Sequence, residues 1–219
     1  MHRRDLLVLT LGAALAGEPL LAHAARQDRD YIVLEKPLDV PRGTLVKFFS
    51  YGCPFCYRYE TMVEPRVLPR AEAAGLRFEP MHVEGRGEYG ATASEFFALC
   101  LLRDRKNGIS PSSSKSLFRR VTTEIGFAYN RQRERWTRGE PAFVAALCAA
   151  AGIEPAEFER ARSSEAVASL VASWRSARET AAVSSVPAYV VNGRYQLVMQ
   201  SIKSIEGMAA LIEELARLP

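Results

Sequence analysis

Two cysteines separated by two residues stand where the chain passes from a strand pattern into a helix pattern, and no other feature constrains the fold as strongly. The pair, Cys53 and Cys56, follows an apolar run at 44–49. Unpaired N–H groups and the partial positive charge of a helix N-terminus stabilise a thiolate, so we expect a lowered pKa for Cys53. Cys56 lies one helical turn further on, close enough to form a small, reducible disulfide with Cys53.

The first 24 residues have the pattern of a secretory signal peptide. Arg3 and Arg4 precede an apolar run at 6–16, and the Ala-His-Ala stretch at 22–24 supplies the small residues of a cleavage site. We therefore predict export and a mature chain that begins at Ala25. The pattern favours the general secretory route and leaves the twin-arginine route open as the alternative. An uncleaved membrane anchor is the alternative, but the apolar run is short for a bilayer.

Charge and histidine content argue against several classes of function. The net charge is +4, and it stays +4 without residues 1–24, which hold two basic and two acidic residues. The arginines lie on predicted helices without interleaved aromatic residues, which indicates solvated helix faces and no nucleic-acid site. Only His82 remains after residue 24, so we expect neither a histidine-rich metal site nor a hydrolase triad. We predict no metal and no cofactor.

Strand patterns at 44–49 and 76–83 surround a helix pattern at 55–74, which predicts a βαβ unit with a parallel strand pair. The helix is expected to have one apolar side, made of Tyr59, Met62, Val63, Val67 and Leu68. Pro65 and Pro69 are expected to kink or interrupt it.

After the βαβ unit the sequence shows helix patterns and no convincing strand. The predicted helices span 91–105, 114–125, 140–151, 155–162 and 164–182. Ser114 is expected to cap the second of these helices. Two further strands, at 188–191 and 195–199, are predicted to form a hairpin through Asn192-Gly193.

Two segments together resemble the thioredoxin fold and, within it, the DsbA family. They are Val-Lys-Phe-Phe-Ser-Tyr-Gly-Cys-Pro-Phe-Cys at 46–56 and Val-Pro-Ala-Tyr-Val-Val-Asn-Gly-Arg-Tyr at 186–195. The resemblance implies an α/β, thioredoxin-like domain at 25–87 and 183–219, interrupted by an all-helical insertion domain at 88–182. The Cys-Pro-Phe-Cys motif is similar to that of the DsbL branch of the family.

The resemblance implies a periplasmic thiol:disulfide oxidoreductase. Such a protein donates its Cys53–Cys56 disulfide to reduced secreted polypeptides during folding, and an inner-membrane, quinone-linked oxidase of the DsbB/DsbI type restores the disulfide. The implied catalytic residues are Cys53, Cys56 and Pro187, and the bond before Pro187 is expected to be cis. Pro54 and Phe55, between the two cysteines, are expected to tune the site.

Val186 and two aromatic residues are expected to lie where the substrate binds. Because Pro187 has no N–H and a fixed shape, it leaves the backbone of Val186 free to pair with an extended substrate strand. Phe55 and Tyr51 either line a shallow apolar groove for unfolded chains or pack inside the protein.

Two positions depart from the family pattern. Lys47 stands where relatives commonly carry a buried acid beneath the disulfide, and Pro80 stands where they carry its basic partner. A lysine there favours a thiolate, so we hypothesise a Cys53 thiolate more stable than in relatives with the acid. Glu60, one turn past Cys56, either relays a proton to Cys56 or is a solvated helix residue.

Other functions remain open from the sequence alone. They are a thiol reductase or isomerase, a redox-independent chaperone-like binding protein, and a zinc site made by all four cysteines. The isomerase loses support because no dimerisation segment precedes Tyr31, whereas isomerases of the family carry one. We also expect a monomer. The second cysteine pair, Cys100 and Cys148, lies in apolar helical stretches. These two residues either form a structural disulfide or are buried free thiols.

Overall fold

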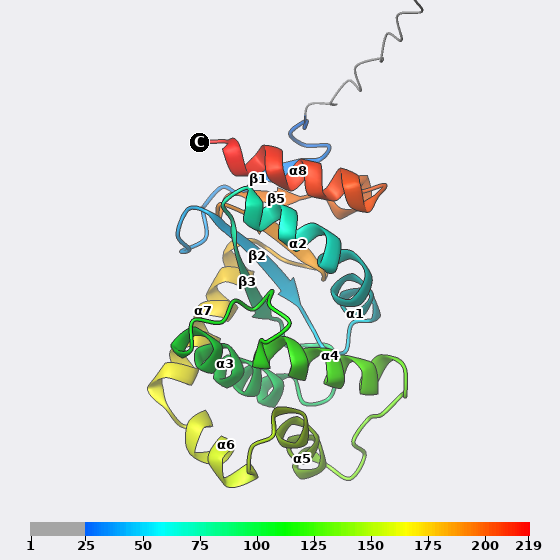
Figure 1. Ribbon diagram of the computed structural model, residues 1–219, viewed down its shortest axis with the longest axis vertical. Helices are drawn as coiled ribbons and strands as arrows, with labels where there is room; N and C mark the ends of the chain where they lie inside the picture. The colour runs from blue at the N-terminus through cyan, green and yellow to red at the C-terminus, as the bar shows by residue number, and fades with distance from the viewer. Residues whose placement is uncertain (1–24) are drawn as a thin grey trace, which may run out of the picture.

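The computed structural model describes residues 25–219, so the predicted signal peptide at 1–24 lies outside the described residues. The described chain forms a mixed sheet of five strands in the order β1-β5-β4-β2-β3 (Figure 1). The strands are β1 (Tyr31–Val33), β2 (Thr44–Phe49), β3 (Arg77–His82), β4 (Ala188–Val191) and β5 (Tyr195–Leu197). β2 and β3 are parallel, as predicted for the βαβ unit, and the other neighbouring strands are antiparallel.

The strand β2 is buried along its whole length because both faces of the sheet are covered. Leu45 packs in a hydrophobic cluster with α2 (Glu64–Ala73) and α8 (Ile205–Arg217). Val46 and Phe48 belong to a second cluster, which they share with helices of the insertion. Figure 1 shows α2 and α8 side by side at one end of the molecule and the insertion helices at the other. Since side chains alternate along a strand, Lys47 lies on the same face as Leu45.

The helix that follows the cysteines is interrupted by one turn of π-helix. The three segments are α1 (Pro54–Arg58), the π-helix η1 (Tyr59–Val63) and α2. The wider turn of the π-helix ends at Val63, and Glu64 caps it by donating its N–H to the carbonyl oxygen of Tyr59. Pro65, which has no N–H to donate, follows directly. This wider turn changes the phase of the helix, so the prediction that Met62 lies on the apolar side is wrong. Met62 is 59% exposed, whereas Glu60 and Glu64 are buried.

Five helices make up the insertion between β3 and β4. They are α3 (Gly90–Lys106), α4 (Leu117–Asn130), α5 (Glu140–Ala151), α6 (Pro155–Arg162) and α7 (Glu165–Thr180). The prediction that Ser114 caps α4 is wrong. Ser116 is the cap, because its hydroxyl accepts the N–H of Arg119 and is held by the buried carboxylate of Asp104.

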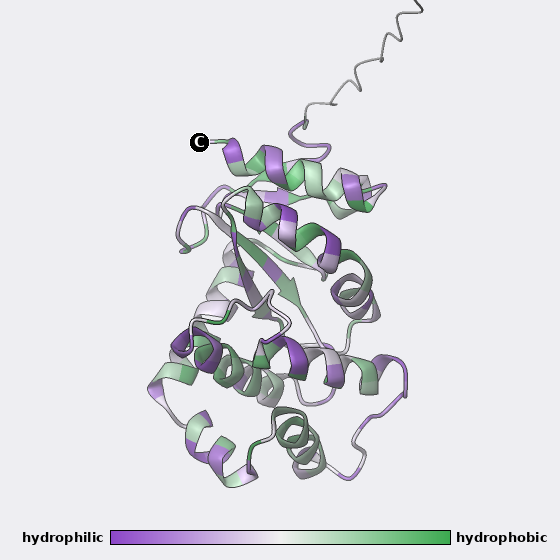
Figure 2. Ribbon diagram, viewed as in Figure 1, coloured by the Kyte–Doolittle hydropathy of each residue, from purple (hydrophilic) through white to green (hydrophobic). Residues whose placement is uncertain are grey.

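Hydrophobic residues are concentrated on the helices that pack in the core of the insertion. Figure 2 shows hydrophobic residues concentrated on α3 and α5, and mostly hydrophilic residues on the loop from α4 to α5. Within residues 25–219 no single helix is both long and apolar enough to cross a bilayer; the bent pair α5 and α6 reaches that length and composition only when taken together.

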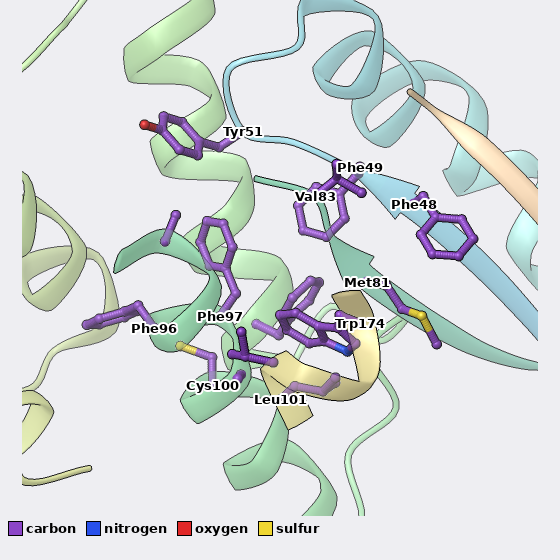
Figure 3. Close-up of a cluster of buried hydrophobic side chains, with 14 of the residues drawn as sticks. Phe48, Phe49, Tyr51, Met81, Val83, Phe96, Phe97, Cys100, Leu101 and Trp174 are labelled. Carbon is purple, nitrogen blue, oxygen red and sulfur yellow. The ribbon is translucent and has the colours of Figure 1, made fainter. Parts of the chain in front are cut away.

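One continuous hydrophobic cluster joins the insertion to the sheet. Figure 3 shows Leu101 of α3 beside Trp174 of α7, Phe49 of β2 above them, and Phe96 and Cys100 pointing to the other side of α3. All of these residues belong to one hydrophobic cluster. The rings of Phe49 and Phe97 have centroids 5.9 Å apart, and Phe118 of α4 packs edge-on against Phe49. The insertion therefore shares its core with the strand that leads to Cys53. The limits of the two predicted domains stay predictions.

Candidate active site

Cys53 lies in the turn between β2 and α1 and is the N-cap residue of α1. Its backbone is extended, and Pro54 takes the first helical position, where a missing N–H leaves no helical bond unmade. The N–H of Cys56 donates to Cys53 Sγ at 3.4 Å. On another side, Cys53 Sγ lies 3.3 Å from the carbonyl oxygen of Val186, to which it donates only when it is protonated. The Val186–Pro187 bond is cis, as the resemblance implies, so the structure brings the predicted catalytic residues together.

The two cysteines have opposite acid–base properties. The pKa of Cys53 is lowered to about 6, first because the Cys56 thiol donates to it, and further because the N–H groups of Cys56 and Phe55 point at its sulfur. The pKa of Cys56 is raised, first by burial and then by its hydrogen bond to Cys53. Cys56 is 1% exposed and Cys53 is 2% exposed. At neutral pH the pair therefore holds one thiolate, at Cys53, and one thiol, at Cys56.

A buried ion pair lies on the sheet face behind the cysteines. Lys47 Nζ lies 2.5 Å from Glu64 Oε1, and the two side chains are 3% and 4% exposed. The hydroxyl of Tyr189 donates to the same Glu64 oxygen at 2.6 Å. Lys47 and Tyr189 are direct neighbours in the register of β2 and β4. A charged group on β2, the strand that leads to the cysteines, is thus paired with the helix that follows them.

Glu60 adds a second buried carboxyl group to this cluster. Its side chain is buried, so the alternative of a solvated helix residue is wrong. Glu60 Oε1 accepts the hydroxyl of Thr122 at 2.9 Å and also the hydroxyl of Thr123. Burial raises the pKa of Glu60 more than the Lys47 ammonium lowers it. A cavity of about 10 Å³ borders Lys47, Glu60 and Glu64, which is room for about one water molecule.

The positive charge of Lys47 acts on Cys56. Burial opposes the Lys47 ammonium, but Glu64, Glu60 and Cys56 together favour it, so the pKa of Lys47 is raised. Lys47 in turn lowers the pKa of Cys56 against the stronger effect of burial. The pKa of Cys53 is instead lowered mainly by the Cys56 thiol and by the N–H groups at the helix start. The sequence-based hypothesis was that Lys47 stabilises a thiolate at Cys53. We now place this effect of Lys47 at Cys56.

Three further residues that the sequence patterns did not predict lie at the site. Glu64 stands four residues after Glu60, a spacing that places both on one helix face and could have revealed it. Tyr189 reaches the site only through the pairing of β4 with β2, which no local pattern shows. Arg86 follows β3 and contributes to lowering the pKa of Cys53, but nothing in its sequence context places that loop beside the cysteines.

The remaining predicted residues divide into exposed and buried ones. Phe55 is 63% exposed and adjoins the catalytic turn, whereas Tyr51 is buried and packs inside the protein. Pro80 lies on β3 as expected, and Glu79 beside it pairs with Arg105 rather than with the cysteines. Within residues 25–219, no three His, Cys, Asp or Glu side chains gather in a way that could hold a metal ion.

Cys100 on α3 and Cys148 on α5 are buried cysteines in one hydrophobic cluster. Burial raises the pKa of both, so neither is a ready nucleophile. A disulfide between them stays a prediction. Mass spectrometry of the oxidised, unreduced protein after proteolysis checks it: a joined pair of peptides identifies the disulfide, and separate peptides identify two buried thiols.

Thiol–disulfide exchange needs a thiolate next to a protonated thiol. The site provides this pair in a turn that lies beside the cis-proline loop. Fold and site together define a thiol:disulfide oxidoreductase. No family model matches the chain, but individual relatives do.

The chain is 42% identical to the thiol:disulfide interchange protein DsbL of Lelliottia amnigena, over 96% of this chain and 94% of that protein. It is 41% identical to DsbL of Escherichia coli O6:H1, over 95% of this chain and 94% of that protein. The crystal structure of DsbL from Salmonella enterica serovar Typhimurium superposes with a TM-score of 0.82 at 41% identity, covering 90% of this chain and 99% of that one. The chain therefore belongs to the DsbL proteins of the DsbA family, and the predicted thioredoxin-like fold with a helical insertion is confirmed.

Proposed function

We propose that the Cys53–Cys56 pair of this oxidoreductase works as an oxidant, donating its disulfide to reduced polypeptides exported to the periplasm. The observation that carries this proposal is the lowered pKa of Cys53, about 6. A sulfur that is stable as a thiolate is a good leaving group, so a mixed disulfide at Cys53 breaks readily in favour of the substrate.

The exchange proceeds in two steps. A substrate thiolate attacks Cys53 Sγ, forming a substrate–Cys53 bond and breaking the Cys53–Cys56 bond, and Cys56 leaves with the electron pair. A second substrate thiolate then attacks the substrate sulfur of the mixed disulfide, and Cys53 leaves as a thiolate. The substrate gains a disulfide, and the protein retains two electrons as a dithiol.

The buried charge cluster serves the leaving Cys56. Lys47 lowers the pKa of Cys56, so it stabilises the negative charge that forms there when the disulfide opens. Glu60, whose pKa is raised by burial, supplies the proton that returns Cys56 to a thiol. Glu64 holds Lys47 in place at 2.5 Å.

Substrate binding uses the residues around the cis bond. Val186 offers its backbone to an extended substrate strand, since Pro187 contributes no N–H of its own. Phe55, exposed next to the catalytic turn, gives apolar contact to an unfolded chain. The protein acts as a monomer, and an inner-membrane, quinone-linked oxidase of the DsbB/DsbI type restores its disulfide. The signal-peptide pattern of residues 1–24 supports the periplasmic location.

The reduction potential tests the direction of transfer. When it is equilibrated with glutathione, the Cys53–Cys56 pair is expected to show a reduction potential of about −120 mV, the reference value for a DsbA. A potential near about −270 mV, as in thioredoxin, would instead make the protein a reductase. Quantifying the dithiol form by alkylation and mass spectrometry gives the value directly.

A further inference from the structure

Helix α4 of the insertion contacts the catalytic turn and the segment after it at three places along its length. Its last residue bonds to the backbone before Cys53, its middle lies against α1, and two of its hydroxyls bond to Glu60. The exchange chemistry described above uses none of these residues of α4. Their shared target is the short stretch of chain that holds both cysteines.

Asn130, at the end of α4, is the contact on the Cys53 side. Its Nδ2 donates to the carbonyl oxygen of Tyr51 and to that of Gly126, each at 2.8 Å. The Tyr51 carbonyl belongs to the peptide that leads into Gly52, directly before Cys53. The next peptide is also packed: a Cβ on Gly52 would lie only 2.8 Å from backbone atoms of the loop that follows β3. The turn is therefore held by the insertion on one side and by this loop on the other.

The other contacts lie on the Cys56 side. A Cβ on Gly126 would lie 3.1 Å from the ring of Tyr57, so α4 approaches α1 directly where the sequence has a glycine. One turn earlier on α4, the hydroxyls of Thr122 and Thr123 donate to Glu60. This part of α4 thus fixes the orientation of a carboxyl group that follows Cys56 by one helical turn.

We infer that α4 positions the redox site, with Asn130 as a positioning residue for Cys53 and the Thr122–Thr123 pair as positioning residues for Glu60. The inference rests on the thiol chemistry of the proposed function, but not on the direction of transfer. Its physical basis is that Cys53 keeps its thiolate through hydrogen bonds from the helix start. Those bonds require a fixed turn, and a looser turn weakens them.

The test of Asn130 is the titration of thiolate absorbance in the reduced protein. The wild type is expected to titrate with a midpoint near pH 6. In Asn130→Ala the midpoint is expected to rise by about half a unit to one unit, because the bonds that stabilise the thiolate loosen. The matched control is Ile125→Val, which shortens a buried apolar side chain of the same helix and is expected to titrate like the wild type.

A second variant keeps the inference testable if Asn130→Ala does not fold. Thr122→Val combined with Thr123→Val preserves side-chain shape and removes both donors to Glu60. Resolution of a Cys53–glutathione mixed disulfide by Cys56 is expected to slow by about three- to tenfold, with its pH profile shifted upward. The inference would be overturned if folded Asn130→Ala titrated like the wild type and the folded double threonine variant resolved the mixed disulfide with the wild-type pH profile. The stability of these variants does not enter this decision. A reductant-like wild-type potential would overturn only the proposed direction of transfer.

Discussion

Replacing Cys53 with alanine is expected to reduce disulfide transfer to the uncatalysed level. The other cysteines cannot substitute for it, because burial raises the pKa of each of them and leaves them as thiols at neutral pH. The measurement is oxidative refolding of a reduced, disulfide-containing model protein, with the oxidised protein as the oxidant in stoichiometric amount. Cys56→Ala is tested with glutathione disulfide instead: its Cys53 thiolate is expected to attack that disulfide, one glutathione leaves as a thiolate, and the Cys53–glutathione mixed disulfide accumulates because no Cys56 thiol resolves it, which is visible by mass.

The matched control for this experiment is Cys148→Ala, which also removes a buried cysteine but lies on α5, outside the catalytic turn. It is expected to retain transfer activity even if it loses stability. Full activity of Cys53→Ala would be incompatible with the exchange mechanism. If that variant also suppressed aggregation of an unfolded substrate as well as the wild type does, the redox-independent, chaperone-like alternative would be favoured.

Local signals in the sequence were sufficient for the elements that carry the cysteines. The apolar run at 44–49 is a buried strand, and the Asn192-Gly193 dipeptide forms the expected hairpin between β4 and β5. The helix predicted at 140–151 has those bounds in the structure, since Gly139 precedes it and Gly152 ends it in a left-handed conformation. Such features depend on neighbours within a few residues, and sequence patterns record them.

Contacts across the fold were beyond the reach of the same patterns. Lys47 reads as an isolated charge in an apolar strand, and its pairing with Glu64 depends on how the helix after the cysteines packs against β2, which the spacing of Glu60 and Glu64 does not give. Asn130 lies 79 residues from Tyr51 in sequence, and no periodicity joins a helix end to a turn in another part of the chain. The sequence therefore points to Cys53, Cys56, Lys47 and Glu60, but not to the distant residues that contact them.

Replacing Lys47 with methionine is expected to destabilise the folded protein by about 3–5 kcal/mol, as removal of one partner of a buried ion pair does. Lys47 is the cation for two buried carboxyl groups, Glu64 at 2.5 Å and the nearby Glu60. Glu64→Gln is expected to cost less, because Lys47 keeps Glu60 as a partner and the glutamine carbonyl can still accept the Tyr189 hydroxyl. Urea unfolding of the reduced proteins measures both differences.

The double variant Lys47→Met with Glu64→Gln separates charge from packing. If the cost of Lys47→Met arises from uncompensated carboxylates, the double variant recovers part of the lost stability; if it arises from packing, the two losses add.

The pH dependence gives a second check on the Lys47→Met variant. Glu60 has a raised pKa in the folded protein, and loss of Lys47 raises it further, so the folded state binds more protons than the unfolded state between the two pKa values. The contribution of this group to stability is then complete below its unfolded pKa and is lost as pH rises through the folded value. The destabilisation of Lys47→Met is therefore expected to be largest at neutral pH and to shrink on acidification. A cost independent of pH would show that Lys47 matters for its volume and not for its charge.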